Sequence, residues 1–177
     1  MGSEMCIRDR SHSAPTFTEN NLSDFENTTC DCHLVWKIDN YDHRYTQAVI
    51  GKPTALHSVP WFTGKNGYKF CARLYLNGDG MGKGTHLSVY FVLMKSEFDN
   101  LFQLPFTNTV TFTLINQDSP DLNVKKSFSV DVNSSSFKKP TNQMNIAYGC
   151  PSFVSHEEMK KPGYIKNQCI FLDVRVK

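Results

Sequence analysis

Segments that alternate apolar and polar positions with a period of two recur along the chain. In the stretch YKFCARLYL, every second residue from Tyr68 to Leu76 is aliphatic or aromatic, whereas Arg73 and Tyr75 lie on the opposite face. Successive side chains of a β-strand point to opposite faces, so this alternation predicts a strand. Similar patterns occupy residues 33–38, 87–94, 109–115, 126–132 and 170–176.

The predicted strands are rich in β-branched and aromatic residues and are separated by Gly, Pro, Asn and Asp. Only SEFDNLF, residues 96–102, suggests a short helix, with Ser96 as its N-cap. No long helical period alternates with the strands, which disfavours a βαβ fold. The sequence therefore predicts an all-β fold: an antiparallel β-sandwich of about eight strands with one short helix.

The same alternation predicts which side chains are buried. Arg73 and Tyr75 are expected to be exposed together on one face of their strand. We expect four large apolar side chains, one from each of four strands, in the core: Trp36, Phe91, Phe112 and Leu172.

The chain has 177 residues, which is enough for one domain with a substantial core. Residues 1–13, MGSEMCIRDRSHS, contain no apolar stretch typical of a signal peptide and resemble a tag or cloning artefact. Residues 14–32 are expected to form a linker or the end of a coiled-coil stalk, with Leu22 and Phe25 at helical spacing. The sandwich domain is expected to span residues 33–177.

Charge and cysteine content exclude several classes of function. The formal net charge is +2 and no cluster of Lys and Arg is present, which argues against nucleic acid as the main partner. The sequence contains no run of eighteen apolar residues, so it predicts no membrane-spanning helix. The six cysteines show no disulfide framework, so we expect a reducing, cytoplasmic location. Cys30, Cys32 and His33 lack the second ligand pair of a structural zinc site, and no metal or cofactor is expected.

The stretch YLNGDGMGKGTH, residues 75–86, contains four alternating glycines. A phosphate-binding or dinucleotide-binding loop would lead into a helix, but a β-patterned run follows here and the glycine spacing fits neither motif. A calcium loop needs oxygen ligands at alternate positions, and Met81 interrupts them. We therefore expect a hairpin turn whose glycines supply positive φ angles.

This glycine loop lies in a longer segment that resembles the C-terminal domain of the tumour-necrosis-factor-receptor-associated factors (the TRAF family), within the wider MATH-domain group. The segment is GYKFCARLYLNGDGMGKGTHLSVYFVLMKSEFDNLFQLPF, residues 67–106. The likeness covers roughly residues 33–177. Its other parts are VWKIDNY (35–41), SSSFKKP (134–140), MNIAYGCPSF (144–153) and IFLDV (170–174), of which the first and last resemble strands and the middle two resemble loops of the family.

The resemblance implies a cytosolic signalling adaptor that trimerises through a coiled coil. Each sandwich of such a protein captures a short extended segment of a receptor's cytoplasmic tail, which adds as a strand along a sheet edge. The implied partners are tails of tumour necrosis factor receptor-type receptors or related adaptors, together with other copies of the same chain. Relatives often carry an N-terminal RING with ubiquitin-ligase activity, but the present chain shows no catalytic motif and is not expected to be an enzyme.

The resemblance also implies which residues contact the peptide. Arg73 and Tyr75 match positions that hold an acidic side chain, and Asp79 lies beside them in the loop. The serine clamp, which holds a Gln or Glu side chain, comprises Ser134, Ser135 and Ser136. An apolar pocket for a small or proline side chain comprises Tyr90, Phe128 and Phe137, and close backbone approach is expected at Gly149.

Tyr148 departs from the family pattern, because the receptor-binding members carry a small serine at this position. We expect its ring to leave the general binding mode intact and to alter the exact peptide consensus, by narrowing the pocket, by changing the preferred peptide residue or by adding a stacking contact.

Three other functions are weaker interpretations. The first is a MATH-type substrate-recognition domain of a ubiquitin ligase or deubiquitinase, which would use the same sandwich to recognise degradation motifs. The second is a secreted carbohydrate-binding sandwich, which the unpaired cysteines and lack of a signal peptide disfavour. The third is thiol catalysis by Cys150 with His86 or His156, for which no orienting third group is evident.

Overall fold

The computed structural model describes residues 33–52, 55–64 and 66–177. The leader, the stalk segment, Cys30 and Cys32 lie outside the described residues. The described strands are β1 (His33–Ile38), β2 (Ala55–His57), β3 (Trp61–Phe62), β4 (Lys69–Tyr75), β5 (His86–Met94), β6 (Val110–Leu114), β7 (Val124–Phe128), β8 (Tyr148–Ser155) and β9 (Ile170–Val176).

Helical elements connect these strands. Two are α-helices, α1 (Tyr41–Val49) and α2 (His156–Met159). Four are single 3₁₀ turns: η3 (Gly80–Gly82), η4 (Asp99–Leu101), η5 (Pro120–Leu122) and η6 (Ser135–Phe137). In the described part of the chain, no helix combines the length and apolar character needed to cross a membrane.

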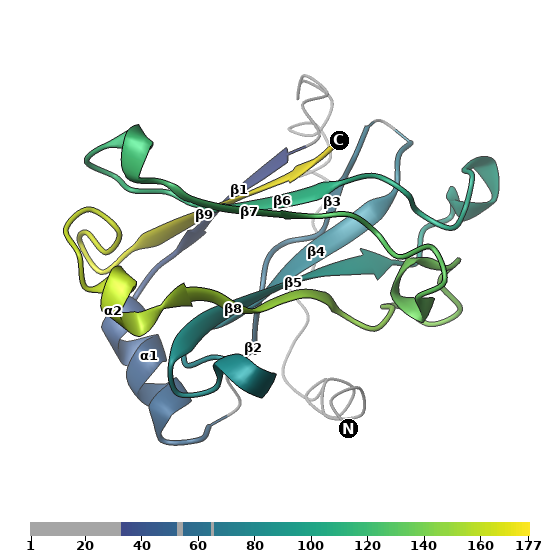
Figure 1. The fold of residues 1–177 in the computed structure, drawn as a ribbon. Helices are drawn as coiled ribbons and strands as arrows, with labels where there is room; N and C mark the ends of the chain where they lie inside the picture. The colour runs from purple at the N-terminus through teal and green to yellow at the C-terminus, as the bar shows by residue number, and fades with distance from the viewer. Residues whose placement is uncertain (1–32, 53–54, 65) are drawn as a thin grey trace, which may run out of the picture. The chain divides into compact units, whose positions relative to one another are not determined.

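The strands form two layered sheets, as Figure 1 shows. One sheet has the order β1-β9-β6-β7, and the other has the order β2-β4-β5-β8 with β3 paired to β4. Every described pairing between strands is antiparallel. The predicted antiparallel β-sandwich is therefore confirmed.

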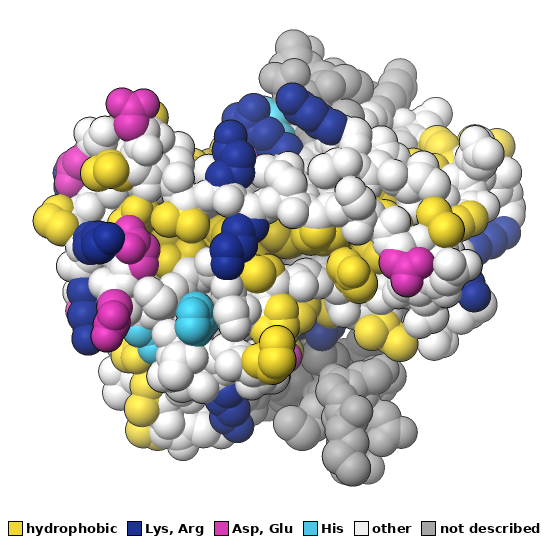
Figure 2. Space-filling view, viewed as in Figure 1, with side chains coloured by type: hydrophobic (Ala, Val, Ile, Leu, Met, Phe, Trp, Pro, Cys, Tyr) yellow, Lys and Arg dark blue, Asp and Glu magenta, His cyan; other side chains and the backbone are white. Residues whose placement is uncertain are grey.

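The two sheets end beside each other at β7 and β8. Lys126 of β7 crosses this gap, and its Nζ donates a hydrogen bond to the Ser152 carbonyl of β8 at 2.6 Å. Figure 2, seen from this side, shows a band of apolar side chains between the positions of β7 and β8. The edge of the five-stranded sheet is therefore flanked by partly apolar surface.

Aromatic rings fill the space between the sheets. Phe91 stacks on Phe106 with ring centroids 5.5 Å apart, and Phe106 in turn stacks on Phe137 at 6.1 Å. All three are almost fully buried, and each buried Phe contributes about 1.5–3 kcal/mol through loss of apolar surface from water. The predicted burial of Phe91 is confirmed, as is that of Phe112 and Leu172.

Trp36 was expected in the core but is only partly buried. It lies on β1, which is an edge strand of the four-stranded sheet, so no strand covers its outer side. Its ring lines a hollow between β1 and β2 rather than the centre of the sandwich.

The short helix predicted over residues 96–102 is found only in part, and Ser96 is not its N-cap. This segment contains only the 3₁₀ turn η4, whose N-cap is Phe98, while the Asp99 carboxylate accepts a hydrogen bond from the Ser96 N–H at 2.9 Å. The nine-residue helix α1 was not predicted, because its polar sequence YDHRYTQAV buries only Tyr41 and Ala48.

Two predicted boundaries also differ from the structure. The segment 144–153 was expected to resemble family loops, but most of it belongs to β8. Gly149 and Pro151 within this strand weaken the sequence signal, since both residues are depleted in strands. β7 begins at Val124, two residues before the expected start at 126. It ends at Phe128, four residues before the expected end at 132.

Candidate functional site

One row of residues crosses the outer face of the five-stranded sheet and ends at its β8 edge. The strand registers place His57 opposite Arg73, Arg73 opposite Tyr90, and Tyr90 opposite Gly149. Directly opposed residues of antiparallel strands lie on the same face of a sheet. The row therefore carries Arg73 and Tyr90 toward the edge formed by β8.

Arg73 is buried rather than exposed, so that part of the sequence prediction is wrong. Only 9% of its surface is accessible. The reason is β2, a strand that the sequence pattern did not reveal: His57 of β2 accepts a hydrogen bond at Nε2 from the Arg73 Nε–H at 2.9 Å. Within the described residues, no carboxylate forms an ion pair with the Arg73 guanidinium.

His57 is the main residue of this region that the sequence analysis missed. Burial of the imidazole against its neighbours, followed by the charge of Arg73, lowers the pKa of His57 to about 4. The ring is therefore neutral near pH 7, even though the residue as a whole is exposed. The segment ALH that forms β2 contains only two apolar residues, and three residues are too few to predict a strand.

Tyr75, Tyr90 and Asp79 form a second group beside Arg73. The rings of Tyr75 and Tyr90 meet edge to face with centroids 5.8 Å apart. Burial and the nearby Asp79 carboxylate raise the pKa of Tyr90, so its hydroxyl keeps its proton at neutral pH. Tyr75 is half-buried, whereas Asp79 is exposed.

The glycine loop positions Asp79. Three of its four glycines have the expected positive φ, at +74° for Gly78, +53° for Gly80 and +78° for Gly84. Gly82 has a different role, because a Cβ atom there would lie 2.0 Å from the Pro151 carbonyl oxygen of β8. The predicted turn is confirmed, and its close approach to β8 depends on Gly82.

Ser88 of β5 links the glycine loop to β5 and to β8 by hydrogen bonds. Its hydroxyl accepts a hydrogen bond from the Asp79 N–H at 2.8 Å and donates one to the Pro151 carbonyl. Asp79 is consequently held at the same end of the sheet as Tyr90.

The three serines lie in and before the 3₁₀ turn η6. Ser134 is the N-cap, and its hydroxyl accepts a hydrogen bond from the Ser136 N–H at 3.2 Å. Ser135 is exposed, whereas Ser136 is buried. The Asn145 side chain braces this turn, because its Nδ2 donates to the Ser136 carbonyl at 3.1 Å and to the Lys138 carbonyl at 2.7 Å.

Tyr148 lies between the aromatic residues that the sequence assigned to an apolar pocket. Its ring centroid is 5.0 Å from that of Phe137 and 5.2 Å from that of Phe128. Phe137 is fully buried and packs on Phe106, whereas Phe128 and Tyr148 are half-buried. Phe137 is therefore a core residue beneath the surface at this position, and Tyr148 covers it.

Gly149 permits β8 to approach β5. A Cβ atom at this position would lie 2.2 Å from the Val89 carbonyl oxygen and 2.6 Å from the Tyr90 Cα atom. The pairing is irregular here, with a register shift between Leu87 and Val89. The close backbone approach expected at Gly149 therefore occurs within the sheet itself.

Gly149→Ala should lower the free energy of unfolding by about 1–3 kcal/mol, since the added methyl group forces β8 away from β5. Urea denaturation at constant pH measures this change. Ser152→Ala on the same strand is the matched control and should stay within about 0.5 kcal/mol of the wild type. Equal stability of the Gly149 variant and the control would contradict the steric argument.

The alternative chemical sites receive no support from the described geometry. Both nitrogens of His156 contact other groups: Nδ1 lies 3.4 Å from the Tyr45 hydroxyl, and Nε2 lies 3.0 Å from the Leu76 carbonyl. His86 Nδ1 lies 2.8 Å from the Thr85 hydroxyl. Across the described ranges, no group of three His, Cys, Asp or Glu side chains could hold a metal ion.

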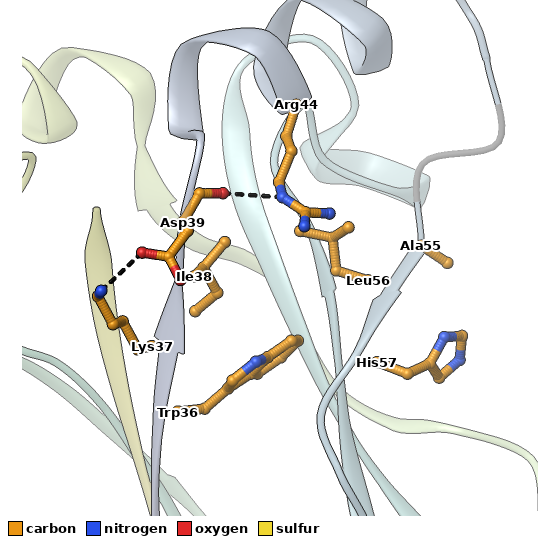
Figure 3. Close-up of a pocket in the computed structure, with 8 residues that line it drawn as sticks. All are labelled: Trp36, Lys37, Ile38, Asp39, Arg44, Ala55, Leu56 and His57. Atoms are coloured by element: carbon orange, nitrogen blue, oxygen red, sulfur yellow. Dashed lines mark hydrogen bonds and ion pairs between the residues drawn. The ribbon is translucent and has the colours of Figure 1, made fainter. Parts of the chain in front are cut away.

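A hollow of about 260 Å³ lies at the other edge of the five-stranded sheet, between β1, α1 and β2 (Figure 3). Its upper part carries charged groups: Lys37 forms an ion pair with Asp39 at 2.8 Å, and the Arg44 Nε–H donates to the Asp39 carbonyl at 2.8 Å. Of the row that leads to β8, only His57 lines this hollow. The β8 end of the row and the hollow therefore lie on different sides of β4.

The fold and these residues define a β-sandwich domain in which a polar row and an aromatic cluster converge on one strand at the edge of a sheet. The family described as TRAF/meprin, MATH domain matches residues 53–173. The chain belongs to this family.

Individual relatives agree with this assignment. TNF receptor-associated factor 5 of Mus musculus is 50% identical over 145 residues, which cover 81% of this chain and 26% of the relative. TNF receptor-associated factor 2 of Homo sapiens is 42% identical over 155 residues, covering 87% and 31%. The solved structure of Notothenia coriiceps TRAF5 superposes with a TM-score of 0.82 at 38% identity, covering 89% of this chain and 78% of that one. The chain thus spans between a quarter and a third of the length of these two curated relatives.

Proposed function

We propose that this domain is the receptor-tail-binding part of a cytoplasmic signalling adaptor. It binds a short, extended peptide of the type Pro-x-Gln-x-Glu, which adds as a strand to the β8 edge. The relatives are named as TNF receptor-associated factors, which supports tails of tumour necrosis factor receptor-type receptors as partners. In the full-length protein the domain is displayed on a homotrimer.

The observation that carries this proposal is that Arg73 is buried without a carboxylate partner among the described residues. A guanidinium that is largely removed from water normally needs an anionic partner, because desolvating a charge is costly. Arg73 is 9% exposed, and no carboxylate of the described residues pairs with it. An acidic side chain of a bound peptide supplies the missing charge.

The edge of β8 suits strand addition. β8 is the last strand of its sheet, and within the described residues only β5 pairs with it. An edge strand presents backbone N–H and C=O groups to a peptide, and alternate peptide side chains then meet the flanking surface. Tyr148 occupies the space beside Phe128 and Phe137, so a small peptide residue fits over this cluster.

Binding by one domain is weak, because a short peptide buries little surface and loses flexibility when it is ordered. Trimeric display raises the avidity for clustered tails by about 10²–10⁴.

Calorimetric titration of a Pro-x-Gln-x-Glu peptide into the wild-type domain tests the proposal. We expect saturable 1:1 binding, and NMR shift changes in β8, around Arg73 and Tyr90, in the glycine loop and at residues 134–136. The same peptide with Gln in place of Glu should bind more weakly, since it lacks the anion that pairs with Arg73. Absence of binding, or shift changes only around the hollow between β1 and β2, would overturn the proposal.

Ser135→Ala should weaken binding of this peptide by about 1 kcal/mol, or roughly fivefold, the typical worth of one neutral hydrogen bond. Ser135 is exposed on η6 and its hydroxyl can both donate to and accept from a peptide amide. Ser127→Ala, an exposed serine of β7 whose hydroxyl pairs with Thr111 at 2.8 Å, is the matched control. Equal losses in the two variants would exclude Ser135 from the contact.

A further inference from the structure

The guanidinium of Arg73 contacts the imidazole of His57. The Arg73 Nε–H donates to His57 Nε2 at 2.9 Å, and the register of β2 and β4 places the two residues directly opposite each other. A guanidinium carries only donors, so His57 Nε2 must hold a lone pair and act as the acceptor. The neutral imidazole therefore carries its proton on Nδ1.

The strand that carries His57 is firmly attached to β4. Next to His57, the Ser58 N–H donates to the Ala72 carbonyl at 2.9 Å, and the Ser58 hydroxyl accepts from the Ala72 N–H at 2.9 Å. Ser58 is itself buried. Figure 3 shows the His57 ring pointing away from Trp36 and Ile38, which line the hollow from the β1 side.

We propose that His57 is a positioning residue for recognition of an acidic peptide side chain. By accepting the Nε–H, it holds the guanidinium in one orientation and leaves the two Nη groups of Arg73 for the ligand carboxylate. A carboxylate that meets a preformed pair of parallel donors loses less conformational freedom than one that must order a mobile arginine. The inference rests on the proposed function and extends its site to β2, at the opposite edge of the sheet from β8.

The geometry also explains why His57 is suited to this task. A carboxylate at the same place would neutralise Arg73 and compete with an acidic ligand. A neutral acceptor fixes the guanidinium and leaves its charge available, because hydrogen bonding to an uncharged imidazole does not cancel the positive charge.

The first test needs no peptide. Nitrogen NMR of the domain at pH 7 should show His57 as the Nδ1–H tautomer, with a lone pair on Nε2. The Arg73 Nε–H should give a signal protected from exchange, and His57→Leu should abolish that protection. An Nε2–H tautomer in the wild type, or unchanged Arg73 protection in His57→Leu, would overturn the assignment.

The second test separates positioning from general stability. His57→Gln retains a side-chain acceptor for Nε–H, whereas His57→Leu fills similar space without one. With the Pro-x-Gln-x-Glu peptide we expect His57→Leu to bind about three- to tenfold more weakly than wild type, and His57→Gln to recover most of the loss. The loss should vanish with the Glu→Gln peptide, because that peptide has no carboxylate for Arg73.

The outcomes distinguish this inference from the proposed function. If neither the wild type nor any variant binds the peptide, the proposed function fails, and the role of His57 in recognition fails with it. If the wild type binds but His57→Leu binds the Pro-x-Gln-x-Glu peptide as tightly as the wild type, or loses the same affinity for both peptides, only the positioning role fails. Thermal unfolding of each variant confirms that the compared proteins are folded.

Discussion

Replacing Arg73 with alanine should weaken binding of the acidic peptide by about 1.5–3 kcal/mol, or roughly 10- to 150-fold, the usual worth of a charge-assisted hydrogen bond. The effect should be large because the guanidinium is 9% exposed and has no ion-pair partner in the described part of the chain. The ligand carboxylate would supply the pairing that the protein lacks. Calorimetry with the wild type and Arg73→Ala measures the difference.

Arg175→Ala is the matched control for this experiment. Arg175 lies on β9, in the other sheet, and its Nε–H donates to the Asp173 carboxylate at 2.7 Å. Removing it deletes the same charge without touching the β8 edge, so affinity should be nearly unchanged. A similar loss in both variants would indicate a general electrostatic effect. No loss in Arg73→Ala would exclude this arginine as the acid-binding residue.

Phe137→Ala should reduce the free energy of unfolding by about 3–5 kcal/mol, the usual cost of truncating a buried phenylalanine. Its side chain is 0% exposed, and its ring stacks with Phe106 at 6.1 Å and Phe91 at 6.4 Å. Truncation removes these contacts and leaves a cavity that the rigid sheets cannot fill. Urea denaturation monitored by fluorescence measures the change, and the unfolding slope should remain that of the wild type.

Phe128→Ala provides the comparison, because this ring is only half-buried at the end of β7. Its stability cost should be clearly smaller than that of Phe137→Ala. Any loss of peptide binding by Phe137→Ala must then be measured at a temperature where the variant is folded. A Phe137 variant as stable as Phe128→Ala would contradict its assignment to the core.

The strands with strong alternation were predictable from local sequence. β9 has the predicted limits, β5 begins one residue before its predicted run, and β4 is one residue shorter than its predicted run at each end. Each of these strands buries one complete face, so its side chains repeat with a period of two. The short strands β2 and β3 gave no such signal, since two or three residues cannot show a period.

Residues of the candidate site were predictable only where they match a family motif. Arg73, Tyr75 and Asp79 were chosen through that resemblance, and the structure places Arg73 and Tyr75 on the outer face of one strand and Asp79 in the loop that follows it. His57 belongs to no quoted motif, and no local pattern connects it with Arg73 sixteen residues later. Its contribution appears only when β2 pairs with β4.

By itself the sequence determined the family, the antiparallel sandwich and the faces of the long strands, because alternation and turn residues act over a few neighbouring positions. Only the tertiary structure decided how those faces are used. Pairing between distant strands buries Arg73 against His57, places Phe137 in the core beneath Tyr148, and brings Gly149 within van der Waals range of β5. Exposure and pairing are properties of the neighbours that a residue acquires on folding, and those neighbours lie far away along the chain.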